Sequence, residues 1–191
     1  MADVKEALEK FRNHWIYDDV NIQLEMEKSA RKEILNLMKL PNDEFQEQMF
    51  PYLRGLPLMR SGVLEPIFEG NSVERIKVAL TVLFNDEKSE NDRLAAMWKL
   101  AGVGKIYASW FLAIATKGDF IIFDHALIAA MKEIEPNHLN EDFLEVYTRK
   151  DLLTFMRACR KVYKKYGFTS FAELRVFLGN GYATDWTFEN L

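Results

Sequence analysis

The chain of 191 residues is 49% hydrophobic and 28% charged, which is typical of one globular domain and excludes a disordered chain. Its formal net charge of −4 argues against a large nonspecific nucleic-acid surface, because affinity for phosphates comes mainly from Lys and Arg. A local basic strip is still compatible with this charge.

The compartment follows from the cysteine content and the apolar runs. The single cysteine, Cys159, excludes an internal disulfide, and its helical surroundings favour a small buried apolar residue. The first residues, MADVKEALEKFRNHW, lack the apolar run of a signal peptide. The longest apolar stretch, residues 106–116, is shorter than a membrane span and is interpreted as a buried helix. We therefore expect an intracellular protein, cytoplasmic or, in a eukaryote, nuclear.

In the N-terminal half, apolar residues recur at helical spacing. This spacing predicts helices over residues 3–16, 20–39 and 43–53. The first of these places Trp15 on its apolar stripe. Prolines and glycines between residues 55 and 70 predict a turn and a broken helix there.

Capping residues predict several of the following helices. Asn71 is expected to cap a helix over residues 72–84, with Glu74 reaching back as in a capping box. The next helix should end near residue 100. Two further helices should cover residues 105–116 and 125–135. The run FIIF, residues 120–123, is the one strand-like stretch, and it is too short to build a sheet.

The C-terminal part continues the helical pattern. Thr148 predicts the cap of a long helix that Gly167 ends, and Thr169 or Ser170 should cap a last helix that ends at Gly179. We therefore predict an all-α fold of roughly ten helices, in one compact domain over residues 1–191. Two lobes around a cleft are the alternative arrangement.

The stretch from residue 99 to 131 has the clearest functional pattern. Gly102-Val103-Gly104 lies between two predicted helices, and its glycines permit a tight turn and close backbone approach. Val103 is expected to turn inward and fix this hairpin. The exposed N–H groups that start the second helix suit a phosphate, and Lys105 can add a positive charge there. An ordinary helix–helix turn is the alternative interpretation.

This pattern, followed by an apolar helix and then by an aspartate before another helix, resembles the helix-hairpin-helix superfamily of DNA glycosylases. The matching residues are Leu100, Gly102, Val103, Gly104, Ala108 and Asp124. The resemblance implies a compact helical domain of that type, with double-stranded DNA as the partner. It makes Asp124 the catalytic carboxylate and Gly102, Val103, Gly104 and Lys105 the phosphate-binding residues. Asp124 is also a suitable N-cap for the next helix, and the two roles are compatible.

The resemblance also indicates the type of reaction. Lyase-competent members carry a lysine two residues after the second glycine, where this chain has Ile106. The resemblance therefore implies a monofunctional glycosylase, which hydrolyses the bond between a damaged base and its sugar. Alkylated bases are candidates for the damaged base. Ile106, Tyr107 and Trp110 are candidates for the base pocket, although Trp110 and Phe111 on an apolar helix are more typical of core. A noncatalytic module that binds DNA or a protein partner is the alternative function.

No cofactor is expected, apart from a monovalent or divalent ion that the hairpin could hold. One cysteine cannot supply the four-cysteine iron–sulfur cluster of one glycosylase branch, and His14 and His138 lack ligand spacing for a catalytic zinc. His125 is interpreted as a surface residue at a helix start, and a monomer is favoured.

A basic run is either a solvated face that complements the helix dipole or a second phosphate-contacting strip; it comprises Arg157, Arg160, Lys161, Lys164 and Lys165.

Overall fold

The computed structural model describes residues 4–57, 61–123, 125–134 and 148–181. These residues form ten α-helices and one short 3₁₀ helix, without a strand among them, so the prediction of an all-α fold with roughly ten helices is confirmed. In chain order they are α1 (Val4–Arg12), η1 (Trp15–Tyr17), α2 (Asp18–Leu37), α3 (Asn42–Arg54), α4 (Ser61–Glu69), α5 (Val73–Leu83), α6 (Glu90–Trp98), α7 (Lys105–Ala115), α8 (His125–Ile134), α9 (Arg149–Tyr166) and α10 (Phe171–Gly181).

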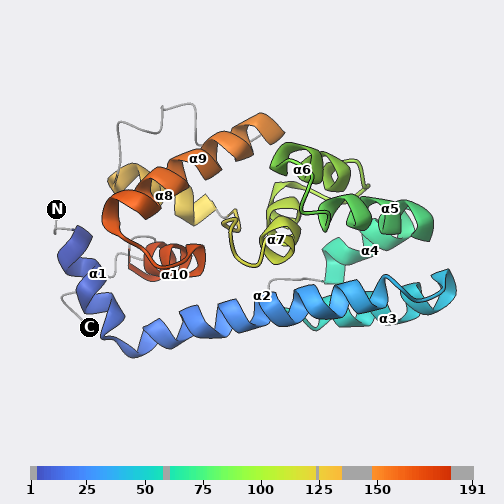
Figure 1. The fold of residues 1–191 in the computed structure, drawn as a ribbon, viewed down its shortest axis with the longest axis horizontal. Coiled ribbons are helices and arrows are strands. Elements are labelled where there is room, and N and C mark those ends of the chain that lie inside the picture. Colours follow the sequence, from blue (N-terminus) through green and yellow to red (C-terminus); the bar gives the residue numbers. More distant parts are fainter. Residues whose placement is uncertain (1–3, 58–60, 124, 135–147, 182–191) are drawn as a thin grey trace.

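The long helix α2 runs along one side of the molecule, and the other helices are arranged over it (Figure 1). Helices α1, α8 and α10 gather at one end, α3 to α6 gather at the other, and α7 lies between the two groups. Helix α7 packs on α2, α5 and α6, and every residue from Ala108 to Ala115 is buried. The predicted apolar helix is therefore the centre of the core. None of the described helices is long and apolar enough to span a membrane.

The predicted ends of α9 are confirmed. The Thr148 hydroxyl accepts a hydrogen bond from the Asp151 N–H at 3.3 Å, and the Asp151 carboxylate accepts one from the Thr148 N–H at 2.8 Å, which completes a capping box. At the other end Gly167 adopts the left-handed conformation, with a φ of 76°. Glycine takes this conformation without the steric cost that a side chain brings.

Two predicted helix ends were wrong. The first helix ends at Arg12, and the chain turns before η1, where the His14 imidazole accepts a hydrogen bond from the Ile16 N–H. Trp15 therefore leaves the apolar stripe and is 71% exposed. The last helix continues to Gly181 rather than ending at Gly179, since a helix tolerates a glycine at a cost of about 1 kcal/mol.

The cap of α5 was also predicted at the wrong residue. Ser72, not Asn71, precedes the helix in extended conformation, and its hydroxyl accepts a hydrogen bond from the Arg75 N–H. The Glu74 carboxylate accepts a hydrogen bond from the Asn42 amide at 2.5 Å. Asn71 is instead used in a contact with a distant part of the chain, described below.

A buried ion pair joins α1 to α10. Arg12 donates to both carboxylate oxygens of Glu173, at 2.7 and 3.2 Å, and the Thr169 hydroxyl donates to the same carboxylate at 2.9 Å. The Glu173 side chain is fully buried, whereas that of Arg12 is 34% exposed. Burial alone would raise the pKa of Glu173, but the hydrogen bonds from Arg12 and Thr169 outweigh it and lower that pKa.

We predict that Glu173→Gln lowers the free energy of unfolding by about 3 kcal/mol, because it leaves Arg12 without its charge partner. Since the folded pKa of Glu173 is lowered, its contribution is complete above the carboxylate's ordinary pKa and is lost as the pH falls through the folded value. Urea unfolding of the unchanged protein and of Glu173→Gln, carried out between pH 7 and pH 3, measures both the loss of stability and its dependence on pH. Glu6→Gln, which removes an exposed pair with Lys10, is the matched control and should change stability by less than about 0.5 kcal/mol. Equal effects of the two substitutions would contradict the prediction.

Candidate functional site

The hairpin between α6 and α7 has the tight geometry that its two glycines predict. The Val103 N–H donates to the Leu100 carbonyl at 3.2 Å, and Gly102 is left-handed with a φ of 80°. Val103 is 6% exposed, so the prediction that it turns inward is confirmed. Gly104 is in extended conformation as the N-cap of α7.

The hairpin is fixed to the start of α5 and to α4. A Cβ atom on Gly102 would lie 2.9 Å from the Pro66 Cβ and 3.0 Å from the Ile67 nitrogen. The Asn71 amide donates to the carbonyls of Ile67, at 2.8 Å, and Ala101, at 3.1 Å, and its oxygen accepts from the Ala101 N–H at 3.0 Å. Asn71 thus satisfies both backbone groups of Ala101. It lies 30 residues from the hairpin, and its sequence neighbourhood indicates only a helix cap.

The start of α7 is open on the side where a phosphate would bind. A Cβ atom on Gly104 would meet no atom of the described residues within 4 Å, and Gly104 provides no side-chain cap. The first intrahelical bond of α7 runs from the Ala108 N–H to the Gly104 carbonyl. Helix geometry gives the N–H groups of Ile106 and Tyr107 no acceptor within the helix, and such groups at a helix start can bind anions.

The segment between α7 and α8 is buried without being part of a sheet. All four residues from Phe120 to Phe123 are at most 2% exposed. The Phe123 N–H donates to the Ser109 hydroxyl at 2.8 Å, and that hydroxyl donates to the Ile106 carbonyl at 2.7 Å. The Ile121 N–H contacts the Met156 sulfur at 3.4 Å. Side chains of α7 and α9 thus accept the backbone hydrogen bonds that a neighbouring strand would accept in a sheet. Ser109 holds the end of the segment against the first turns of α7.

The expected catalytic residue, Asp124, lies outside the described residues, but both of its neighbours are described. Phe123 is in the core, and His125 is exposed at the start of α8, as expected. The Lys105 ammonium lies 5.4 Å from the centre of the Phe123 ring. The hairpin and the segment that ends at Phe123 therefore meet at the N-terminal end of α7.

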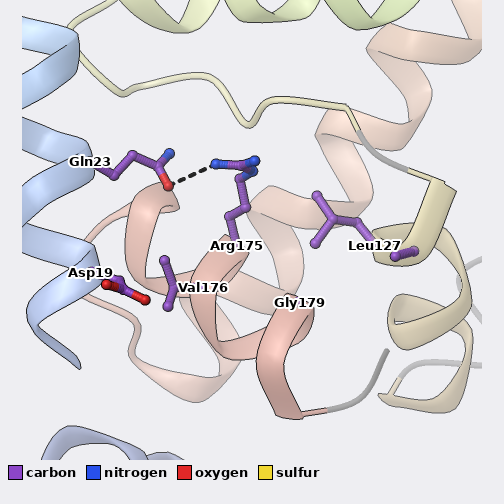
Figure 2. Close-up of a pocket in the computed structure, with 7 residues that line it drawn as sticks. Asp19, Gln23, Leu127, Arg175, Val176 and Gly179 are labelled. Carbon is purple, nitrogen blue, oxygen red and sulfur yellow. Dashed lines mark hydrogen bonds between the residues drawn. The ribbon is translucent and has the colours of Figure 1, made fainter. Parts of the chain in front are cut away.

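A hollow of about 290 Å³ lies beside the first turn of α8 (Figure 2). It is lined by Asp19 and Gln23 of α2, by Ala126 and Leu127 of α8, and by Arg175, Val176 and Gly179 of α10. We refer to it as the α2–α10 hollow. Figure 2 shows the Arg175 and Gln23 side chains meeting across it, with the Arg175 guanidinium donating to the Gln23 oxygen at 2.9 Å.

A buried carboxylate extends this polar chain. The Gln23 amide donates to one Glu27 oxygen at 2.8 Å, while the other Glu27 oxygen has no hydrogen-bond partner among the described residues. Glu27 is 2% exposed, and its burial raises its pKa. A Cβ atom on Gly118, whose φ is 87°, would lie 2.9 Å from that second oxygen. Glu27 therefore lies beneath the turn that begins the segment leading to Asp124.

The base-pocket candidates lie in different environments. Ile106 is 41% exposed and Tyr107 is half-buried, both near the open start of α7. Trp110 is 1% exposed and packs edge-on against Phe111, so both are core residues, which was the interpretation favoured for them. Within this conformation Trp110 has no surface on which a base could stack.

The remaining candidates are dispersed. Arg160 forms a two-pronged ion pair with Glu90 of α6, whereas Arg157, Lys161 and Lys164 are exposed on α9. Cys159 is buried, and burial raises the pKa of its thiol, as expected for a structural cysteine. His138 lies outside the described residues. Within the described ranges, no group of three or more potential ligands is arranged to hold a metal ion.

Comparison with protein-family models, curated proteins and solved structures gives no significant match to this chain. The resemblance to the glycosylases therefore rests on the sequence pattern from Leu100 to Asp124 alone.

Gly102 and Gly104 should differ sharply in their tolerance of a side chain. We predict that Gly102→Ala lowers the free energy of unfolding by about 2 kcal/mol or more, because it adds left-handed strain to a contact with Pro66. Gly104→Ala should leave stability within about 1 kcal/mol, since its conformation is ordinary and its surroundings are open. Chemical denaturation of the two variants tests this, and similar losses in both would contradict the described packing.

Proposed function

We propose that this protein is a monofunctional DNA glycosylase, which hydrolyses the N-glycosidic bond of a damaged base flipped out of duplex DNA. The observation that carries the proposal is the convergence at the N-terminal end of α7. The exposed helix start at Gly104 lies there near Phe123, whose N–H donates to Ser109 of the same helix. Phe123 directly precedes Asp124 in the sequence, which supports a carboxylate close to the candidate phosphate site.

The hairpin would bind one phosphate of the DNA backbone. The N–H groups of the first turn of α7 would point at the phosphate, and the helix dipole would favour its charge. Gly104 leaves the approach open, whereas Gly102 serves the hairpin's packing on Pro66. Lys105 would add a positive charge next to the segment that ends at Asp124.

The reaction needs one carboxylate. Departure of the base leaves a cationic, oxocarbenium-like sugar, as in glycoside hydrolysis. An ionised Asp124 would stabilise that cation or take a proton from the water that attacks it. Because no lysine stands at the position of Ile106, the proposal includes no Schiff base and no strand cleavage.

The flipped base needs a pocket, and flipping costs a few kcal/mol, which favours damaged or mispaired bases. Two surfaces are candidates, and both lie near described residues that neighbour Asp124 in the sequence. One is formed by Ile106 and Tyr107 on α7, and the other is the α2–α10 hollow, which begins two residues after Asp124. The notion of an alkylated base as substrate rests on the resemblance alone.

A noncatalytic helical module that binds DNA or a protein is the second candidate. The observations that favour it are the net charge of −4 and the pairing of Arg160 with Glu90, which removes one cation from the basic strip on α9. Both candidates place a phosphate at the hairpin if DNA is the partner. They differ in whether Asp124 takes part in binding a cationic sugar.

The first measurement is affinity for duplex DNA that carries one cationic, base-free sugar mimic, against the same duplex undamaged at fixed salt. Because the mimic resembles the charged transition state, we expect a preference of at least about a hundredfold. Asp124→Asn should remove this preference and keep the fold, since asparagine also caps a helix. In a screen of damaged duplexes it should likewise abolish base release.

Other results would redirect the assignment. Equal, weak binding to both duplexes that falls steeply with salt would leave a hairpin that holds only phosphates. An absence of binding to either duplex would favour the protein-binding module. Full activity in Asp124→Asn would exclude the catalytic role of this carboxylate.

The phosphate site has its own test. Gly104→Asp should place a carboxylate on the open N–H groups of α7, which stabilises the helix start by about 0.5 kcal/mol. The same carboxylate should weaken binding to both duplexes at least about tenfold, because it competes with the phosphate. Denaturation measures the stability and DNA titration measures the affinity. A gain in stability together with a loss of affinity would show that the variant blocks the site and does not damage the fold. Unchanged DNA affinity would contradict the anchor role of Gly104.

A further inference from the structure

A second hollow, of about 630 Å³, lies between α3 and α4 and shares no lining residue with the α2–α10 hollow. We refer to it as the α3–α4 groove. Its α3 wall is a stripe at helical spacing from Asp43 to Pro51, and its α4 wall is formed by Glu65, Phe68 and Glu69. Helices α3 and α4 pack against each other, so the groove is the valley along their contact.

The floor of the groove is aromatic. Helix α3 buries Phe45, Met49 and Leu53, which are spaced four residues apart. Phe50 is one residue beyond Met49, and this rotates it by about 100° out of the core. It is half-buried, and its ring packs edge-on against the half-buried ring of Phe68, with 5.3 Å between the ring centres. An apolar side chain could bury itself on this pair.

The rim of the groove is acidic. Asp43, Glu47, Glu65 and Glu69 line it, and the described residues that line the groove include no Lys, Arg or His. All four carboxylate residues are exposed, and none of them belongs to an ion pair in the described part of the chain. This concentration of negative charge repels nucleic-acid phosphates and complements a basic ligand.

Gln46 adds an amide to the α3 wall. The groove therefore combines carboxylate and amide oxygens above an apolar floor, a set that suits the N–H donors of Lys and Arg.

We propose that the α3–α4 groove binds a basic segment of a partner protein. One apolar side chain of the segment packs on Phe50 and Phe68, and its Lys or Arg side chains meet the carboxylates of the rim. The α3 wall from residue 43 to 51 is about 12 Å long, so the segment is short: about four extended residues, or two turns of helix. This interaction is independent of Asp124 and of base excision.

The experiment uses a short fluorescent peptide that alternates arginine or lysine with leucine, and an acidic version in which glutamate replaces each basic residue. The full-length protein should bind the basic peptide and not the acidic one. Glu47→Lys/Glu69→Lys should weaken that binding at least about tenfold. Glu9→Lys/Glu133→Lys makes the same change of net charge on exposed residues of α1 and α8, and it should stay within about twofold of the unchanged protein.

A second variant tests the aromatic floor. Phe68→Ser should weaken binding of the basic peptide at high salt as well as at low salt, because it removes apolar contact rather than charge. Circular dichroism on each variant identifies loss of fold. If Phe68→Ser does not fold, Phe68→Leu is measured in its place. Equal affinity of the two charge-reversed proteins, or of the two peptides, would overturn the proposal. Self-association that occurs without peptide and is lost only in Glu47→Lys/Glu69→Lys would overturn it in favour of a second copy of this chain.

Discussion

The burial of α7 is the constraint on which the rest of the structure depends. From Ala108 to Ala115 every residue is buried, so the helix contacts neighbours on all sides and only its first turn reaches the surface. The preceding hairpin must therefore be tight, and it is held from outside by Asn71 and by the contact of Gly102 with Pro66. The following segment must return through the core, where Ser109 provides a hydrogen-bond partner for the Phe123 N–H.

The two glycines of the hairpin have separate physical roles. Gly102 has positive φ and no space for a Cβ, so its requirement for glycine is structural. Gly104 has neither constraint, because its backbone is extended and its surroundings are open. Glycine is also a common N-cap residue, so Gly104 is compatible with an ordinary helix start. Under the proposed function, the same glycine lets a phosphate approach the backbone closely.

The sequence predicted the helices well because local signals define them. The capping box of Thr148 and the left-handed Gly167 lie within the residues that they terminate, and apolar spacing identified α7 as core. Asn71 was assigned wrongly because its partner, Ala101, is 30 residues away and no local pattern records that contact. Ser109 and Arg175 escaped prediction for the same reason, since their partners Phe123 and Gln23 lie on other segments of the chain.

Charge bears on how the two proposed binding surfaces could coexist on an acidic chain. The four carboxylates of the α3–α4 groove have no cation among the described residues that line it, so negative charge gathers at that groove. Helix α4 separates the two surfaces: Pro66 and Ile67 meet the hairpin, whereas Glu65, Phe68 and Glu69 line the groove. Because interactions between exposed charges are screened over about 8 Å in physiological salt, the acidic groove repels phosphates only locally. The helix dipole of α7 and Lys105 can therefore still attract a phosphate at the hairpin.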